Sequence, residues 1–199
     1  MKFKDSKTKE NLAKAYAAEC QAGARYQFMA TKAQSEQLAY IQGTMKMLAK
    51  NEMAHAKLFY DYIIDNGGEC NILISADYPY VLSDLESSLK AEAEVEREEF
   101  EEIYPEFAAI AREEGFEDIA ESFDVVAKVE KTHSAILKYL AKNYNSNSYY
   151  KSREKILLKC SNCGHIDKGT DAWEICPLCS LGKGYVEINY NPILINSLN

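Results

Sequence analysis

Apolar residues recur at intervals of three and four over four long stretches of the chain, the pattern of helices that bury one face. In one stretch the apolar positions are Met45, Leu48, Phe59 and Tyr62. The steps of three and four between these positions are continuous only if Glu52 and His55 are included, so both side chains are predicted to point into a core. A buried carboxylate is costly unless something compensates its charge.

Three other stripes are interrupted by acidic or imidazole side chains in the same way. They consist of Leu12, Tyr16, Glu19, Gly23, Tyr26 and Ala30; of Leu85, Leu89, Glu92, Glu96, Glu99 and Ile103; and of Ile119, Phe123, Val126, Glu130, His133, Leu137 and Leu140. A lone acid on such a stripe is usually a surface residue. Four interrupted stripes instead favour one shared polar interior.

The interrupting residues have the spacing of a dinuclear metal site. Four of them form two Glu-x-x-His pairs, Glu52 with His55 and Glu130 with His133, which places each pair on one helix face. Carboxylates on two helices and Glu-x-x-His on the other two are the ligand set of a di-iron bundle core. The separations Glu19–Glu52 and Glu96–Glu130 are 33 and 34 residues, so the chain reads as two similar helix pairs.

The pattern predicts helices over residues 8–35, 36–65, 84–114 and 116–143, with Ser6 or Thr8 capping the first and Ser83 or Asp84 beginning the third. Asn66-Gly67-Gly68 should end the second helix. Residues 69–82 lose the pattern and are expected to be a crossover along the bundle, and Pro105 should kink the third helix. The predicted fold class is an all-α ferritin-like four-helix bundle with one long crossover.

The C-terminal part has a different composition. We expect a bundle domain over residues 1–145, a polar linker over 146–154 and a small β domain over 155–199, with strands near 156–158 and 185–188. This last part is too short to build a large core and should need a metal.

Two C-x-x-C pairs in this part indicate a tetrathiolate metal site. They are Cys160 with Cys163 and Cys176 with Cys179, and twelve residues lie between the two pairs. The short spacer favours one iron over the zinc of a zinc ribbon, although thiolates accept either metal. His165 is expected to be a surface residue or a neighbour of the metal ligands, and Trp173 to cover the metal.

Composition narrows the class of partner. The 199 residues are 47% apolar and carry a net charge of −8, which argues against a nucleic-acid partner. No signal-like segment or 18-residue apolar run occurs, so no membrane partner is expected. The free thiols Cys20 and Cys70 fit a reducing cytoplasm.

Together these features resemble the rubrerythrin family over essentially the whole chain. The resemblance is carried by residues 15–19, 52–55, 96–99, 103–108 and 130–133, followed by the rubredoxin-like tail. Each motif alone is weak, whereas all of them in this order are specific. One departure is Ser180, which stands where rubredoxins usually have Gly.

The resemblance implies a non-haem di-iron site joined to a rubredoxin-like Fe(Cys)4 domain, with iron bound by Cys160, Cys163, Cys176 and Cys179. The implied di-iron ligands are Glu19, Glu52, His55, Glu96, Glu99, Glu130 and His133. One iron is expected to switch between His55 and Glu99, while Tyr26 and Tyr104 hydrogen-bond ligand carboxylates.

The implied activity is a peroxidase that reduces hydrogen peroxide to water in oxidative-stress defence. Electrons would come through the tail iron from a rubredoxin or an NADH-dependent reductase, and a head-to-tail homodimer could bring the two sites together. Three alternatives stay open. They are iron oxidation and storage as in ferritins, an oxygen reductase, and an interaction protein whose tail is a zinc ribbon.

Overall fold

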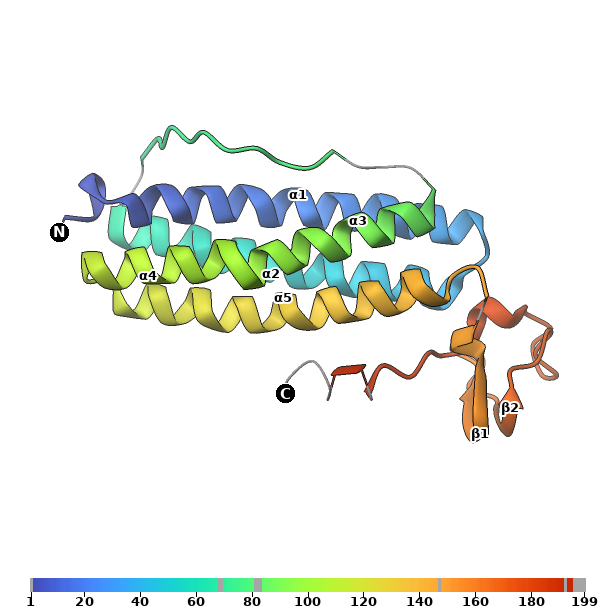
Figure 1. The fold of residues 1–199 in the computed structure, drawn as a ribbon. Helices are drawn as coiled ribbons and strands as arrows, with labels where there is room; N and C mark the ends of the chain where they lie inside the picture. Colours follow the sequence, from blue (N-terminus) through green and yellow to red (C-terminus); the bar gives the residue numbers. More distant parts are fainter. Residues whose placement is uncertain (1, 68–69, 81–83, 147, 192, 195–199) are drawn as a thin grey trace.

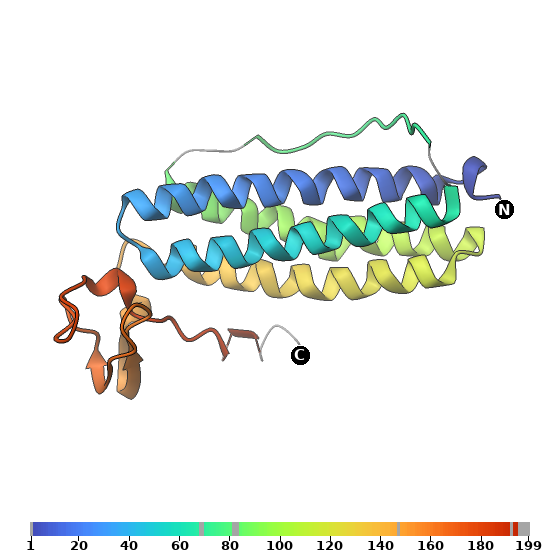
Figure 2. The same ribbon diagram turned by 180° about the vertical axis from the view of Figure 1, so that it is seen from behind.

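The chain forms a bundle of four long helical stretches with a small domain at one end (Figure 1). The computed structural model describes residues 2–67, 70–80, 84–146, 148–191 and 193–194. After a short 3-10 turn, η1 (Phe3–Asp5), the helical elements are α1 (Lys7–Ser35), α2 (Ala39–Gly67), α3 (Leu85–Glu98), the π-helical turn η2 (Glu99–Ile103), α4 (Tyr104–Glu114) and α5 (Glu117–Asn143). The predicted ferritin-like bundle is confirmed, with α1 packed mainly on α2, and α3 and α4 packed on α5 (Figure 2).

The helix ends follow from local side-chain chemistry. The Ser6 hydroxyl accepts a hydrogen bond from the backbone N–H of Lys9, and the Asp84 carboxylate accepts one from that of Ser87, so each residue caps a helix. The predicted start of the second helix at residue 36 was wrong, because Gln37 takes a left-handed conformation (φ 61°) that no helix can include. Ser83, Gly68 and residues 69, 81 and 82, to which predictions were also attached, lie outside the described residues.

The third helical stretch departs most from the prediction. Pro105 was expected to kink one continuous helix, but the irregularity is a π turn that ends just before it, closed by a hydrogen bond from the Tyr104 N–H to the Glu99 carbonyl. A π turn inserts one residue into the helical register. Ile103, predicted to continue the buried stripe, is therefore 37% exposed, and Tyr104 takes its place in the core at 1%.

Tyr16 was also predicted to be buried and is instead at the surface. Its ring lies against that of Tyr60 across the outer seam between α1 and α2, with centroids 5.7 Å apart. The neighbouring Ala15 points into the core instead. A buried stripe predicted from steps of three and four residues can therefore be wrong by one position, as it is here.

The bundle core consists of two apolar clusters. One includes Leu48, Leu89 and Leu137 and lies towards the small domain. The other includes Phe59 and Phe123 and lies towards the N-terminus. On each helix the acidic and imidazole residues expected to bind metal fall between the two clusters in sequence, so apolar side chains close the polar interior at both ends.

The crossover runs along the outside of the bundle above α1 and α3 (Figure 1). It has no regular secondary structure over residues 70–80. The hydroxyl of Tyr78 donates a hydrogen bond to the carbonyl of Lys14, 3.2 Å away. This contact ties the crossover to α1.

None of the helices in the described residues is long and apolar enough to cross a membrane.

The C-terminal part is a small two-stranded unit built around the cysteines. It consists of η3 (Ser148–Tyr150), β1 (Lys151–Lys159), β2 (Ile166–Asp171) and η4 (Lys183–Tyr185), with β1 and β2 antiparallel. β1 thus begins inside the stretch expected to be a linker. The second predicted strand, 185–188, is reduced to an isolated bridge between Val186 and Cys160.

This unit is seated on the α1–α2 turn of the bundle. A Cβ atom placed on Gly184 would lie 2.0 Å from the Gln37 carbonyl oxygen, so only glycine permits this approach. Beyond it, the ring of Tyr190 stacks on Tyr40 of α2 with centroids 6.2 Å apart. The described C-terminal segment therefore returns along the bundle (Figure 1).

Candidate metal centres

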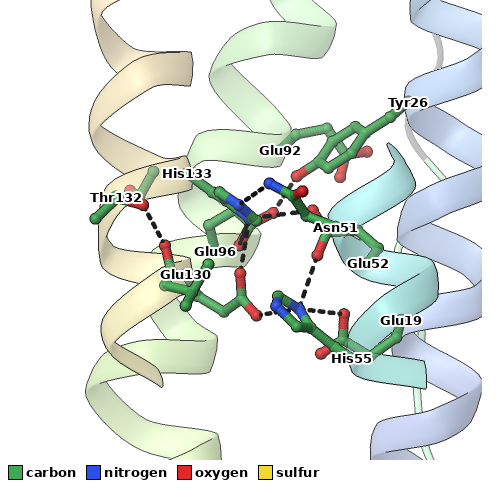
Figure 3. Close-up of polar contacts among 12 residues, drawn as sticks. Glu19, Tyr26, Asn51, Glu52, His55, Glu92, Glu96, Glu130, Thr132 and His133 are labelled. Atoms are coloured by element: carbon green, nitrogen blue, oxygen red, sulfur yellow. Dashed lines mark hydrogen bonds and ion pairs between the residues drawn. The ribbon is translucent and has the colours of Figure 1, made fainter. Parts of the chain in front are cut away.

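One group of inward-pointing side chains surrounds His55 (Figure 3). Its Nδ1 lies 2.9 Å from Glu130 Oε1, 3.2 Å from Glu52 Oε2 and 3.4 Å from Glu19 Oε2. The three carboxylates come from α5, α2 and α1, so three helices must pack correctly to assemble the group. All three carboxylates are buried.

A second group surrounds His133 in the same manner. Its Nδ1 lies 2.8 Å from Glu130 Oε2, 3.1 Å from Glu52 Oε1 and 3.9 Å from Glu96 Oε2. Glu52 and Glu130 therefore belong to both groups, and each directs one oxygen to each imidazole. Glu19 and Glu96 each belong to one group only.

The donor atoms fit two bound cations. Within each group one ligand atom from each of four residues lies within 4.8 Å of the others. Seven buried atoms of these two groups have no hydrogen-bond partner of acceptable geometry among the described residues: both oxygens of Glu52 and of Glu130, Glu96 Oε2, and Nδ1 of His55 and of His133. Buried polar atoms without partners are rare in folded proteins. One cation bound within each group would give all seven atoms a partner.

Two tyrosines fix the outer carboxylates. The Tyr26 hydroxyl donates a hydrogen bond to Glu96 Oε1, and the Tyr104 hydroxyl donates one to Glu19 Oε1. Both tyrosines are fully buried. Each outer carboxylate therefore has one oxygen held by a phenol and the other free to face the centre.

The four cysteines converge on a second site. The Sγ atoms of Cys160 and Cys179 are 3.8 Å apart, and those of Cys163 and Cys176 are 3.7 Å apart. Four sulfurs about 2.3 Å from a central ion in a tetrahedron are about 3.8 Å from one another. The spacing thus suits one tetrahedrally bound metal ion.

Comparison with known proteins gives the family. The sequence profile of the Rubrerythrin family matches residues 10–141, and that of the rubrerythrin rubredoxin-like domain matches residues 159–187. A rubrerythrin of Clostridium perfringens is 39% identical over 187 residues, covering 94% of this chain and 96% of that protein. The chain belongs to the rubrerythrin family.

Other rubrerythrins and solved structures agree with this assignment. The rubrerythrin of Nitratidesulfovibrio vulgaris is 33% identical, covering 94% of this chain and 96% of that protein. A structure of nigerythrin in a partially reduced state has a TM-score of 0.62 at 25% identity, covering 95% and 94% of the two chains. A bacterioferritin of Desulfovibrio desulfuricans, with a TM-score of 0.63 at 23% identity over 70% of this chain and 81% of that one, shares the bundle fold.

Of the seven bundle ligands expected from the rubrerythrin family, the structure brings six into the two groups. Glu99 lies outside both groups, although it is buried. Burial and the charges of Glu19, Glu130 and Glu52 raise its pKa well above the usual range, so it lies near the same centre. His55, the residue with which it was expected to alternate, faces the centre.

Sequence reasoning missed two polar partners of this centre. The Arg25 Nε and Nη2 atoms donate hydrogen bonds of 2.6 and 3.0 Å to the two oxygens of Glu92, a buried acid on the same stripe as Glu96. The Nδ2 atom of Asn51 lies 3.3 Å from His133 Nε2, and the same amide turned by 180° would offer its oxygen as the acceptor for the Nε2–H when Nδ1 faces a metal. Both contacts join different helices, so spacing along one helix does not reveal them.

Protons balance the charge of the centre when no metal is bound. Burial opposes a charge on His55, but the adjacent carboxylates of Glu130, Glu19 and Glu52 outweigh it and raise the pKa of the imidazole to about 12. In the same way the pKa of His133 rises to about 10. Burial and the Glu130 charge raise the pKa of Glu19 to about 8. The centre therefore retains positive charge at its core with or without metal.

The two cysteine knuckles have matching backbones. In the first, Cys160 N–H bonds the His165 carbonyl and Gly164 N–H bonds the Cys160 carbonyl. In the second, Cys176 N–H bonds the Leu181 carbonyl and Ser180 N–H bonds the Cys176 carbonyl. Gly164 and Ser180 both have a positive φ, of 74° and 62°. Ser180 thus adopts the conformation that glycine would adopt there.

The rings of His165 and Trp173 lie against each other beside this site, with centroids 5.2 Å apart and a tilt of 57° between their planes. Both are half-buried. Trp173 also packs against the apolar cluster of the bundle that contains Leu48. Its expected role as a cover for the metal stays a prediction.

Proposed function

We propose that this chain is a non-haem di-iron peroxidase that reduces hydrogen peroxide to water. The observation that carries the proposal is the sharing of Glu52 and Glu130 between two four-residue groups, in a chain that also has a tetracysteine site. Membership of the rubrerythrin family supports iron as the metal at both sites. When bound, the two bundle irons supply the two electrons that cleave the O–O bond.

The side chains of the bundle centre would have different roles in binding the two metals. Glu52 and Glu130 would each hold both metals, while Glu19, Glu96 and His133 would each hold one. His55 and Glu99 would alternate at one position, so that an anionic or a neutral donor matches the charge of the centre. Tyr26 and Tyr104 would keep Glu96 and Glu19 oriented, and the two apolar clusters would keep bulk water out.

Reduction of one peroxide molecule consumes two electrons and two protons and yields two water molecules. Glu99 would carry a proton, because burial and nearby charges favour its neutral form. Electrons would pass through the tail iron from a rubredoxin or an NADH-dependent reductase. A head-to-tail homodimer would bring a partner's tail beside the bundle, and the free thiols suit a cytoplasmic location.

The test compares oxidants and variants in rapid-mixing experiments. The iron-loaded protein is reduced without oxygen and then mixed with hydrogen peroxide or with dioxygen, while visible absorption reports oxidation. We expect peroxide to oxidise the bundle irons at least tenfold faster than dioxygen. Faster oxidation by dioxygen would favour an oxygen reductase, and accumulation of ferric mineral would favour a ferritin-like role.

A cysteine variant tests the path of electrons. Cys179→Ser removes one thiolate of the tail site and leaves the bundle unchanged, and Cys70→Ser in the crossover is the control. We expect Cys179→Ser to retain a single oxidation by peroxide and to lose sustained turnover with a rubredoxin as donor. Sustained turnover at the unmodified rate would contradict the proposed electron path.

A further inference from the structure

A cavity of about 510 Å³ lies between the crossover, α1 and the helical stretch that contains the π turn. The crossover covers this side of the bundle (Figure 1), and Tyr78 ties it to α1. The cavity walls include Glu99 and Tyr104, so it reaches the side chains beside the metal centre.

The lining is mainly apolar with a polar inner end, and the charged residues Lys14, Arg25, Asp77, Glu98 and Glu106 also contribute to it. The apolar part includes Ala18 of α1, Val95 of α3 and Phe107 of α4. Glu99 and Tyr104 lie at the inner end and are almost completely buried. Sites for small organic molecules have this character, with volumes of about 300–1,000 Å³ and a few polar groups.

The volume is large for hydrogen peroxide. A water molecule takes about 30 Å³ of liquid, so a molecule of two oxygen atoms needs roughly 60 Å³. The cavity is several times larger. A substrate with an apolar group of about the size of a phenylpropyl group would fit inside it, with its oxygen atoms at the inner end.

We propose that this cavity binds organic hydroperoxides, with the apolar substituent among Ala18, Val95 and Phe107 and the hydroperoxide group towards Glu99 and Tyr104. The inference rests on the proposed peroxidase function and names a further substrate class for the same site. The O–O bond breaks, one oxygen leaves in the alcohol and the other in water, and two protons are taken up. The two electrons come from the donor of the peroxidase reaction.

A binding experiment tests the cavity without turnover. The probe is cumyl alcohol, the alcohol produced from cumene hydroperoxide, added to the full-length metal-free chain and followed by ligand-observed NMR and calorimetry. Ala18→Leu fills the cavity from α1, and Ala24→Leu, on the exposed face of the same helix, is the matched control. We expect the unmodified chain and Ala24→Leu to bind alike, and Ala18→Leu to bind at least tenfold more weakly.

Equal binding by all three proteins, or no binding by the unmodified chain, would overturn the inference. If circular dichroism shows that Ala18→Leu does not fold, Val95→Phe fills the cavity from α3 instead. The same loss of binding is expected for it.

Turnover distinguishes this inference from the peroxidase proposal. In the iron-loaded protein we expect Ala18→Leu to lower kcat/KM for cumene hydroperoxide at least tenfold and to change kcat/KM for hydrogen peroxide less than twofold. If the unmodified enzyme reduces hydrogen peroxide but not cumene hydroperoxide, the inference fails and the peroxidase proposal stands. If it reduces neither, the peroxidase proposal fails, and organic hydroperoxides are excluded with it even where cumyl alcohol binds.

Discussion

The hydroxyl of Tyr104 donates a hydrogen bond to Oε1 of Glu19, 85 positions earlier in the chain. This contact depends on the π turn Glu99–Ile103, because a regular helix would have placed Ile103 at the buried position. One inserted residue thus supplies a phenol to a carboxylate that faces the metal centre. π turns occur frequently at functional sites.

Replacing Tyr104 with Phe should leave a buried oxygen of Glu19 without its donor. Loss of one such hydrogen bond costs about 1–3 kcal/mol. We expect the free energy of unfolding of the metal-free chain to fall by about that amount in urea denaturation. Tyr80→Phe, in the exposed part of the crossover, is the control and should have no effect. An unchanged free energy of unfolding in Tyr104→Phe would show that the bond contributes nothing.

Metal binding at the bundle should weaken as the pH falls. The pKa values of His55 and His133 are raised to about 12 and about 10 in the metal-free centre, so both carry protons at pH 7 that a metal must displace. We expect the apparent affinity for Fe²⁺ or Zn²⁺ to rise about tenfold per pH unit for each proton released. Competition with a chelator between pH 6 and pH 8 measures this slope.

The metal-free chain should show the opposite trend in stability. A histidine whose pKa is raised by folding stabilises the folded state below its unfolded pKa, near 6.5, and loses this contribution as pH rises towards the folded value. We therefore expect the Tm of the metal-free protein to fall from pH 7 towards pH 10. A constant Tm over this range would show that the histidines are neutral in the absence of metal.

The buried pair of Arg25 and Glu92 offers a double-variant test. Arg25→Met leaves a charged carboxylate buried without a partner, which typically costs about 3–5 kcal/mol. Arg25→Met combined with Glu92→Leu removes both charges and should recover most of that loss. Urea denaturation of the single and double variants measures the difference, and a double variant less stable than Arg25→Met would contradict the explanation.

Much of this arrangement could be predicted from the sequence, because six inward-pointing ligands interrupt apolar stripes that are otherwise regular. The π turn could not be predicted, since Ile103 is itself apolar and fits an uninterrupted stripe. Arg25 and Asn51 were missed because each meets its partner on another helix. The second helix was predicted to start too early because Gln37 has a left-handed backbone conformation. A glutamine side chain gives no strong indication of that conformation in the sequence.

The knuckle backbones predict a stabilising substitution at Ser180. A residue other than glycine at positive φ costs about 1 kcal/mol, so Ser180→Gly should stabilise the tail unit by about 0.5–1 kcal/mol. Gly164→Ala should destabilise it by a similar amount, because no other atom lies near its Cβ position and only backbone strain changes. The temperature at which the tail metal is released from each variant measures both effects. A lower release temperature for Ser180→Gly would show that the serine side chain has a role of its own.

Because Glu52 and Glu130 each present one oxygen to either imidazole, the two halves of the bundle centre are not independent compartments. The first cation to enter orients both shared carboxylates for the second, so occupancy should proceed in pairs. A stoichiometric titration followed by native mass spectrometry would then pass from apoprotein to the doubly loaded form with little of the singly loaded species between them.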